Sequence, residues 1–103
     1  MAFSKAKFFD ESSYVRSLWA KALSHPARII ILSHLLEHGT SPFADLVRII
    51  PLAKTTVSQH LRSLRQSGLI EPEVKHPTTC YKLNRKTCSD LAIRITSWEN
   101  GFF

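Results

Sequence analysis

The chain has 103 residues, of which 44% are hydrophobic and 21% are charged, with 14 lysines and arginines against eight acidic residues. This composition predicts one small folded domain rather than a disordered tail, and the formal charge of +6 favours nucleic acid, an anionic membrane surface or an acidic protein as partner. No apolar run reaches the roughly 20 residues of a membrane span and the N-terminus lacks a signal-peptide core, so we expect a cytoplasmic protein without a membrane partner.

The first half of the chain has the spacing of two consecutive helices. Over residues 10–23, apolar side chains recur at i, i+1, i+4, i+5 and i+8 from Tyr14, which is typical of one wide face of an amphipathic helix. Pro26 suits the first turn of a second helix over residues 27–38, which Gly39 ends. Isoleucines and leucines occupy most sides of this second helix, so we expect it at the centre of the core.

Turn residues then separate two further helices. Ser41-Pro42 begins a third helix over residues 42–49, and residues 51–53 turn into a fourth helix that ends at Ser67-Gly68. Where a helix-capping serine or threonine is usual, Ala53 precedes the fourth helix. Its first turn therefore either lacks a cap or begins later, at Thr55.

The pattern after Gly68 is that of strands. Residues 69–75 and 80–83 predict a two-stranded hairpin, in which Pro72 confines its strand to a sheet edge or a bulge. A last helix is expected over residues 87–98. The order α-α-α-α-β-β-α predicts a mainly α protein with a small β-hairpin, a winged helix-turn-helix domain that spans residues 1–103.

The fourth helix has two chemically distinct faces. Val57, Leu61 and Leu64 form a narrow apolar stripe, and short polar and cationic side chains lie opposite, namely Thr55, Gln59, Arg62, Ser63 and Gln66. Between residues 48 and 70 there are four basic residues and no acidic one, so a polyanion meets little repulsion there. These groups hydrogen-bond base edges and phosphates, which indicates double-stranded DNA as the partner.

Individual roles follow from side-chain chemistry. Gln59 is the best candidate for reading a base, because an amide pairs with adenine through two hydrogen bonds, and Lys54 and Arg62 suit phosphates. His60 lies beside the apolar stripe and either contacts a phosphate or packs under the wing. The predicted DNA-binding residues on the helix and the hairpin are Lys54, Thr55, Thr56, Ser58, Gln59, His60, Arg62, Ser63, Lys75, His76 and Thr78. For any single hairpin residue, an ordinary polar turn is an equally good interpretation.

Three stretches resemble the ArsR-type winged-helix repressors of prokaryotes. The first covers residues 22–32 and begins with alanine-leucine-serine-histidine-proline-alanine-arginine. The second covers residues 46–52. The third covers residues 56–70, where the run threonine-valine-serine-glutamine-histidine-leucine is followed at the end by glycine-leucine. The match covers about residues 18–83 in order and spacing.

The resemblance implies a homodimer whose first and last helices, about residues 10–23 and 87–99, pack across a two-fold axis. Two recognition helices would then face an inverted-repeat operator, on DNA in the prokaryotic nucleoid. The apolar faces of these terminal helices also have more surface than so small a core can bury. The predicted interface residues are Tyr14, Leu18, Trp19, Leu91, Ile95 and Trp98.

The chain departs from the metal-sensing members of that family. Pro42 and Ala44 occupy the positions of their cysteine pair, and Asp90 is followed by Ala92 where zinc-sensing relatives have histidine. We therefore expect no metal and no cofactor. His34 and His38, spaced i, i+4, are better explained as a polar edge of the core helix than as metal ligands, and Cys80 and Cys88 as thiols than as a regulatory disulfide.

These observations predict a sequence-specific transcriptional regulator, a homodimeric repressor that occupies operator DNA. The alternative is a winged-helix module for protein–protein contact, since a fold does not dictate its function. An enzyme is not expected, because the sequence contains no paired carboxylates in a plausible pocket, no phosphate-binding glycine loop and no supported nucleophile triad.

Overall fold

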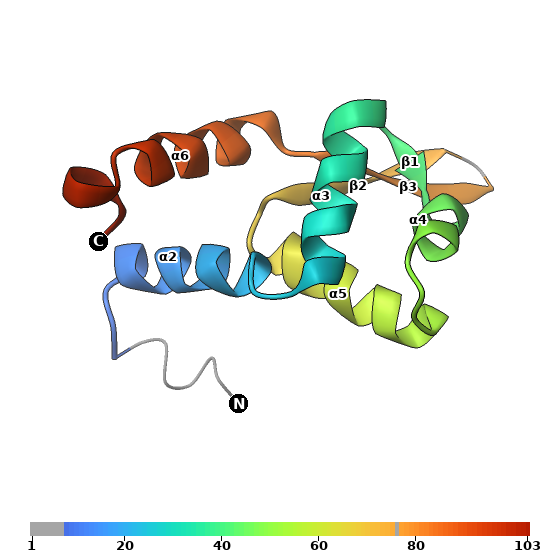
Figure 1. Ribbon diagram of the computed structural model, residues 1–103, viewed down its shortest axis with the longest axis horizontal. Helices are drawn as coiled ribbons and strands as arrows, with labels where there is room; N and C mark the ends of the chain where they lie inside the picture. Colours follow the sequence, from blue (N-terminus) through green and yellow to red (C-terminus); the bar gives the residue numbers. More distant parts are fainter. Residues whose placement is uncertain (1–7, 76) are drawn as a thin grey trace.

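The computed structural model describes residues 8–75 and 77–103. Its helices and strands follow the predicted order (Figure 1): α2 Glu11–Ala22, α3 Pro26–His38, β1 Ser41–Pro42, α4 Phe43–Ile49, α5 Lys54–Gln66, β2 Ile70–Lys75, β3 Thr78–Leu83, α6 Arg85–Thr96 and a π-helical turn, η1, Trp98–Phe102. The predicted mainly helical winged fold is therefore confirmed. The short strand β1 was not predicted, and the last helix begins two residues earlier than expected.

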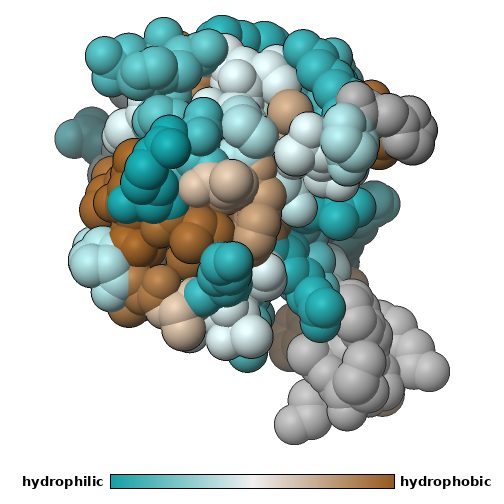
Figure 2. All heavy atoms as spheres, turned by 90° about the vertical axis from the view of Figure 1, so that its right-hand side faces the viewer, coloured by the Kyte–Doolittle hydropathy of each residue, from teal (hydrophilic) through white to brown (hydrophobic). Residues whose placement is uncertain are grey.

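Helix α3 is the core helix, as predicted. Ala27, Ile31 and Leu35 are buried along one side of it, against Leu46 of α4 and Leu61 of α5. Part of the helix surface faces outward, however. Ile29, Ile30 and Leu36 are exposed by 44%, 41% and 63%, so the apolar composition of α3 overstates its burial. In the view that faces α4 and the hairpin, Figure 2 shows an apolar area beside a mostly hydrophilic surface.

Side chains and a glycine define the helix ends. Asp10 caps α2 by accepting a hydrogen bond from the amide of Ser13 at 3.0 Å. It also accepts from the Ser13 hydroxyl at 2.7 Å, and this bond, followed by the amide bond, holds the pKa of the Asp10 carboxyl below its usual range. Asn84 caps α6 by accepting from the amide of Thr87 at 3.1 Å. Gly68 follows α5 with φ +81°, a left-handed conformation that side-chain-bearing residues rarely adopt. The chain turns there from the helix into β2.

The sheet is antiparallel and has the order β1-β3-β2. Ser41 of β1 pairs with Tyr81 of β3, and Lys75 of β2 pairs with Thr78 at the tip of the hairpin. The edge position of β2 confirms the expectation for Pro72, because a proline has no amide hydrogen for a central ladder.

Two residues predicted at a dimer interface are largely buried inside the protomer. Trp19 and Leu91 are 6% and 7% exposed and belong to one core cluster, and Trp19 Nε1 donates to the backbone oxygen of Ser67 at 3.2 Å. Both side chains are thus largely covered within one chain, which an apolar helix face alone does not reveal, and their part in a dimer interface stays a prediction. Ile95 and Trp98 stay exposed, by 42% and 55%. Figure 1 places α2 and α6 at the end of the molecule opposite the hairpin tip.

Candidate nucleic-acid interface

Helix α5 presents the polar surface that the sequence indicates. Val57, Leu61 and Leu64 are buried at 2% exposure or less. The exposed side chains of α5 are Lys54, Thr55, Ser58, Gln59, Arg62, Arg65 and Gln66, and α5 contains no acidic residue. Its outer surface is therefore made of hydroxyls, amides and positive charges, and it is open to a large partner.

Ser63 and His60 do not belong to that outer surface. Ser63 is 9% exposed and His60 is 8% exposed, so placing Ser63 opposite the apolar stripe was wrong. The buried arc of α5 is wider than the stripe of three apolar residues, because α2 and α3 both pack against this helix. Thr56, which is half-buried, lies at the edge of the arc.

His60 packs against the start of α3 and not under the wing. Its ring lies 4.3 Å from the ring of His25, centroid to centroid, and its Nδ1 accepts a hydrogen bond from Arg28 Nε at 3.0 Å. Burial lowers the pKa of His60, and the neighbouring His25 and Arg28 lower it further. Because Arg28 Nε can only donate, Nδ1 is the acceptor nitrogen of a neutral imidazole, and the ring proton lies on Nε2.

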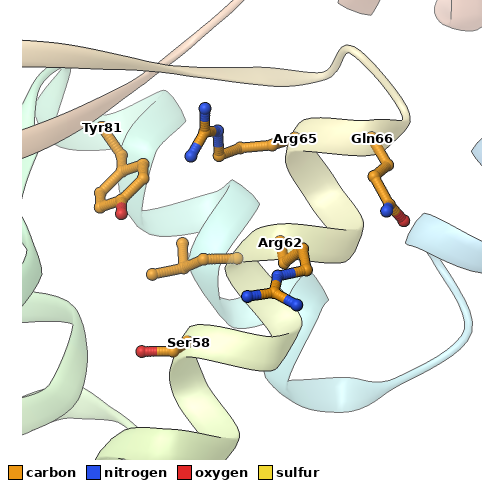
Figure 3. Close-up of a pocket in the computed structure, with 6 residues that line it drawn as sticks. Ser58, Arg62, Arg65, Gln66 and Tyr81 are labelled. Atoms are coloured by element: carbon orange, nitrogen blue, oxygen red, sulfur yellow. The ribbon is translucent and has the colours of Figure 1, made fainter.

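A hollow of about 510 Å³ lies between α5 and the sheet. It is lined by Ser58, Leu61, Arg62, Arg65, Gln66 and Tyr81. In Figure 3, the Arg65 side chain extends from α5 toward Tyr81 of β3, and the Ser58 hydroxyl lies on the same side of the helix. Two guanidinium groups and a phenol around one hollow suit a phosphate group.

The sequence analysis missed Arg65 and Tyr81 as candidates. Arg65 follows Ser58 by seven residues and Arg62 by three, which places all three on one side of a helix. That spacing is a signal from which Arg65 could have been predicted. The proximity of Tyr81 has no such signal, because it depends on how the sheet packs beside α5.

The hairpin is cationic only toward its tip. Lys75, Thr78 and Thr79 are exposed there, and His76 lies outside the described residues. Lys82, further from the tip, is paired with two acids of β2, with Nζ 3.6 Å from Glu71 and 4.0 Å from Glu73. These carboxylates largely neutralise the charge of Lys82.

The first turn of α5 has no side-chain cap. Ala53 occupies the N-cap position and makes no side-chain hydrogen bond to the helix, which decides between the two alternatives for this turn. The amide hydrogens at the start of a helix carry partial positive charge. Those of Lys54 and Thr55 are thus not used by a capping side chain.

Residues considered for metal or redox chemistry lie apart from this surface. The rings of His34 and His38 stack at 4.3 Å, but among residues 8–75 and 77–103 no group of three His, Cys, Asp or Glu side chains is placed to hold a metal. Cys80 and Cys88 are both thiols, and burial raises the pKa of Cys88. The expected absence of metal stays a prediction.

Comparison with known proteins decides the family. The sequence pattern described as "bacterial regulatory protein, arsR family" matches residues 25–71. The HTH-type transcriptional regulator YgaV of Escherichia coli is 40% identical over 71 residues, which are 69% of this chain and 72% of that protein. The chain belongs to the ArsR family.

Other relatives agree with this assignment. The biofilm growth-associated repressor of Xylella fastidiosa is 32% identical over 71 residues, which are 69% of this chain and 61% of that protein. Among solved structures, HlyU from Vibrio cholerae superposes with a TM-score of 0.65 at 26% identity, over 84% of this chain and 97% of that one. The repressor BigR from Xylella fastidiosa superposes with a TM-score of 0.61 at 30% identity, over 78% of this chain and 82% of that one.

The protein is a transcriptional regulator and not an enzyme, as predicted. No helix in the described part of the chain has the length and apolar character to cross a bilayer.

Proposed function

We propose that this protein is a homodimeric repressor that places one α5 helix of each protomer in successive major grooves of an inverted-repeat operator. The exposed, acid-free face of α5 carries this proposal. A helix enters the major groove readily, and its N-terminal half reaches the base edges. Such a regulator acts in the cytoplasm, on DNA of the nucleoid.

We assign base reading to Gln59 and phosphate contact to the cations around it. Gln59 is exposed on the outer face of α5, one turn after Thr55. Lys54 and Arg62 flank it, and Lys75 extends the cationic surface to the hairpin tip. Thr55, Thr56 and Ser58 supply hydroxyls near the same edge, and Thr78 supplies one beside Lys75. In this proposal the Gln59 contact specifies the DNA sequence, and the other contacts position the protein on the duplex.

The exposed apolar residues of the C-terminal segment support dimerisation. Ile93, Ile95 and Trp98 are exposed by 63%, 42% and 55%, an unusual surface for a monomer. With Tyr14 and Leu18 of α2, which are partly exposed, they form the proposed two-fold contact. Two-fold symmetry would place the half-site centres about 34 Å apart, or a multiple of that distance.

The test is selection of bound fragments from random DNA, combined with the mass of the protein in solution. A dimer that enriches an inverted repeat is the expected result. Gln59→Ala should weaken binding to the selected operator by about 1–3 kcal/mol, roughly 5–150-fold, and binding to random duplex far less. The comparison variant is Gln66→Ala, which removes the same side chain in the last turn of α5, beside the hollow that suits a phosphate. Any loss for this variant should be equal on operator and random duplex.

Two results would contradict the proposal. Equal losses for Gln59→Ala on operator and random duplex would remove the base-reading role. Failure to enrich any DNA would favour the alternative of a winged-helix module for protein–protein contact.

A further inference from the structure

One arginine connects three segments that the proposed function assigns to different tasks. Arg28, in the first turn of α3, donates from Nε to His60 of α5 at 3.0 Å. Its Nη1 donates to the backbone oxygen of Lys21, in the last turn of α2, and lies 3.5 Å from Ser24 Oγ. A single guanidinium thus joins α2, the α2–α3 turn and α5.

Each of these acceptors suits a cation. The carbonyl of Lys21 lies at the negative end of the α2 dipole and gathers several donors, since it also accepts from the amide of Ser24 at 3.1 Å and from the Ser24 hydroxyl at 2.6 Å. His60 is buried and neutral, so its Nδ1 lone pair is an acceptor that would otherwise be unsatisfied. The planar guanidinium directs its donors in fixed directions, which a lysine does not.

The contact lies at the middle of α5, and a second contact lies at its end. Trp19 of α2 donates to Ser67, just after the last turn of α5, and Arg28 reaches His60, in the central turns. The buried apolar stripe of α5 holds the helix against the core. Two hydrogen bonds spaced along the helix also resist its rotation on that apolar surface, whereas a single one leaves a pivot. Of these two, Arg28 alone acts close to the residues proposed to contact DNA.

Small rotations of α5 matter on the scale of DNA. Its 13 residues make a helix about 20 Å long, so rotation by about 10° about the remaining attachment near Ser67 moves the N-terminal end by about 3 Å. That displacement is comparable to the roughly 3.4 Å rise of one base pair. A recognition helix that rotates freely would therefore tolerate half-sites that a fixed helix rejects.

We propose that Arg28 is a positioning residue that fixes the orientation of α5 relative to α2 and thereby sets the half-site spacing that the dimer accepts. This inference rests on the proposed function, since it requires a dimer formed through α2 and α6 on an inverted repeat. Arg28 itself touches no DNA in this arrangement. It acts on the orientation of α5 through its contacts with His60 and with the C-terminal end of α2.

The experiment measures affinity for a series of operators whose half-sites are moved apart or together by one and two base pairs. The variants are Arg28→Met, Arg28→Lys and, as a control for loss of one positive charge, Arg85→Met. Arg85 is exposed at the start of α6 and is not among the proposed DNA contacts. Sedimentation and thermal unfolding are recorded for every variant, so that dimerisation and folding are known.

The wild-type protein should prefer one spacing by about tenfold or more, and Arg85→Met should behave likewise. Arg28→Met should lose affinity on the preferred operator and lower the preference to about threefold or less. Arg28→Lys keeps the charge and the fold but reaches fewer acceptors at once, so its preference should lie between the two.

The outcomes separate the two proposals. If Arg28→Met and Arg28→Lys keep the wild-type spacing preference, whatever their affinity or melting temperature, the positioning role is wrong. An equal loss at every spacing would assign Arg28 to general stability or to phosphate contact, and would also overturn it. A wild-type protein that binds no DNA, or that ignores spacing, contradicts the proposed dimeric repressor instead.

Discussion

Replacing Trp19 by phenylalanine tests whether this residue belongs to the protomer core. Trp19 is 6% exposed, and its Nε1 donates to the backbone oxygen of Ser67 at 3.2 Å. Phenylalanine removes that hydrogen bond, at a net cost of about 1 kcal/mol. It also buries about 40 Å² less apolar surface, worth about 1 kcal/mol at 25 cal/mol per Å².

The sum predicts a loss of about 2 kcal/mol in the free energy of unfolding, or a fall of roughly 8–15 °C in the melting temperature of a domain this size. Urea and thermal unfolding followed by circular dichroism measure it, at one fixed protein concentration because dimerisation shifts apparent stability. Sedimentation at several concentrations measures the dimer separately. We expect a clear fall in the free energy of unfolding and little change in the dimer dissociation constant.

Trp98→Phe is the matched control, because Trp98 is the other tryptophan and is 55% exposed. It has no hydrogen bond to the α5 end to lose, and its predicted effect is on the dimer. If Trp19→Phe instead leaves the unfolding free energy within about 0.5 kcal/mol and raises the dimer dissociation constant, our placement of Trp19 in the core is refuted.

Further predictions concern a helix cap, pH and metal. Asn84→Ala should cost about 1 kcal/mol in unfolding free energy through loss of the α6 cap, with Asn84→Ser partly restoring it. Because the pKa of His60 is lowered in the fold, the unfolded chain binds a proton first as pH falls below about 6.5, so stability should decline from there toward lower pH. His60→Asn should flatten that part of a curve of melting temperature against pH, and an unchanged slope would contradict a neutral, buried His60. Added zinc should leave operator affinity unchanged, since Pro42 and Ala44 offer no ligand atoms; release of DNA at low micromolar zinc would show a site that we have not identified.

Much of the fold could be predicted because the apolar periodicity is strong. The stripe of Val57, Leu61 and Leu64 placed α5 and its buried side correctly, and Pro72 placed β2 at an edge. Strand β1 has only two residues, one of them a proline. Such a strand has no pattern of its own and exists only because β3 lies beside it.

The sequence could not show which neighbour covers each face of a helix. Trp19 and Leu91 have the pattern of an interface, yet each is covered by the same chain. Ser63 is polar and still buried, because the arc of α5 that meets α2 and α3 is wider than its apolar stripe. The hollow between Arg65 and Tyr81 arises likewise from tertiary packing.

The ion pairs of Lys82 described above, and a further pair in α4, limit how strongly ionic strength acts on binding. Arg48 is paired with Asp45 at 2.7 Å, and Lys82 with Glu71 and Glu73. Within the described interface this leaves cations without an acidic partner at Lys54, Arg62, Arg65 and Lys75. Two protomers would then displace about eight counterions from the duplex, so the logarithm of the association constant should fall with the logarithm of the salt concentration with a slope near −7. The acids of β2 would thus reduce the non-specific share of affinity and leave discrimination to Gln59, the residue that we propose reads a base.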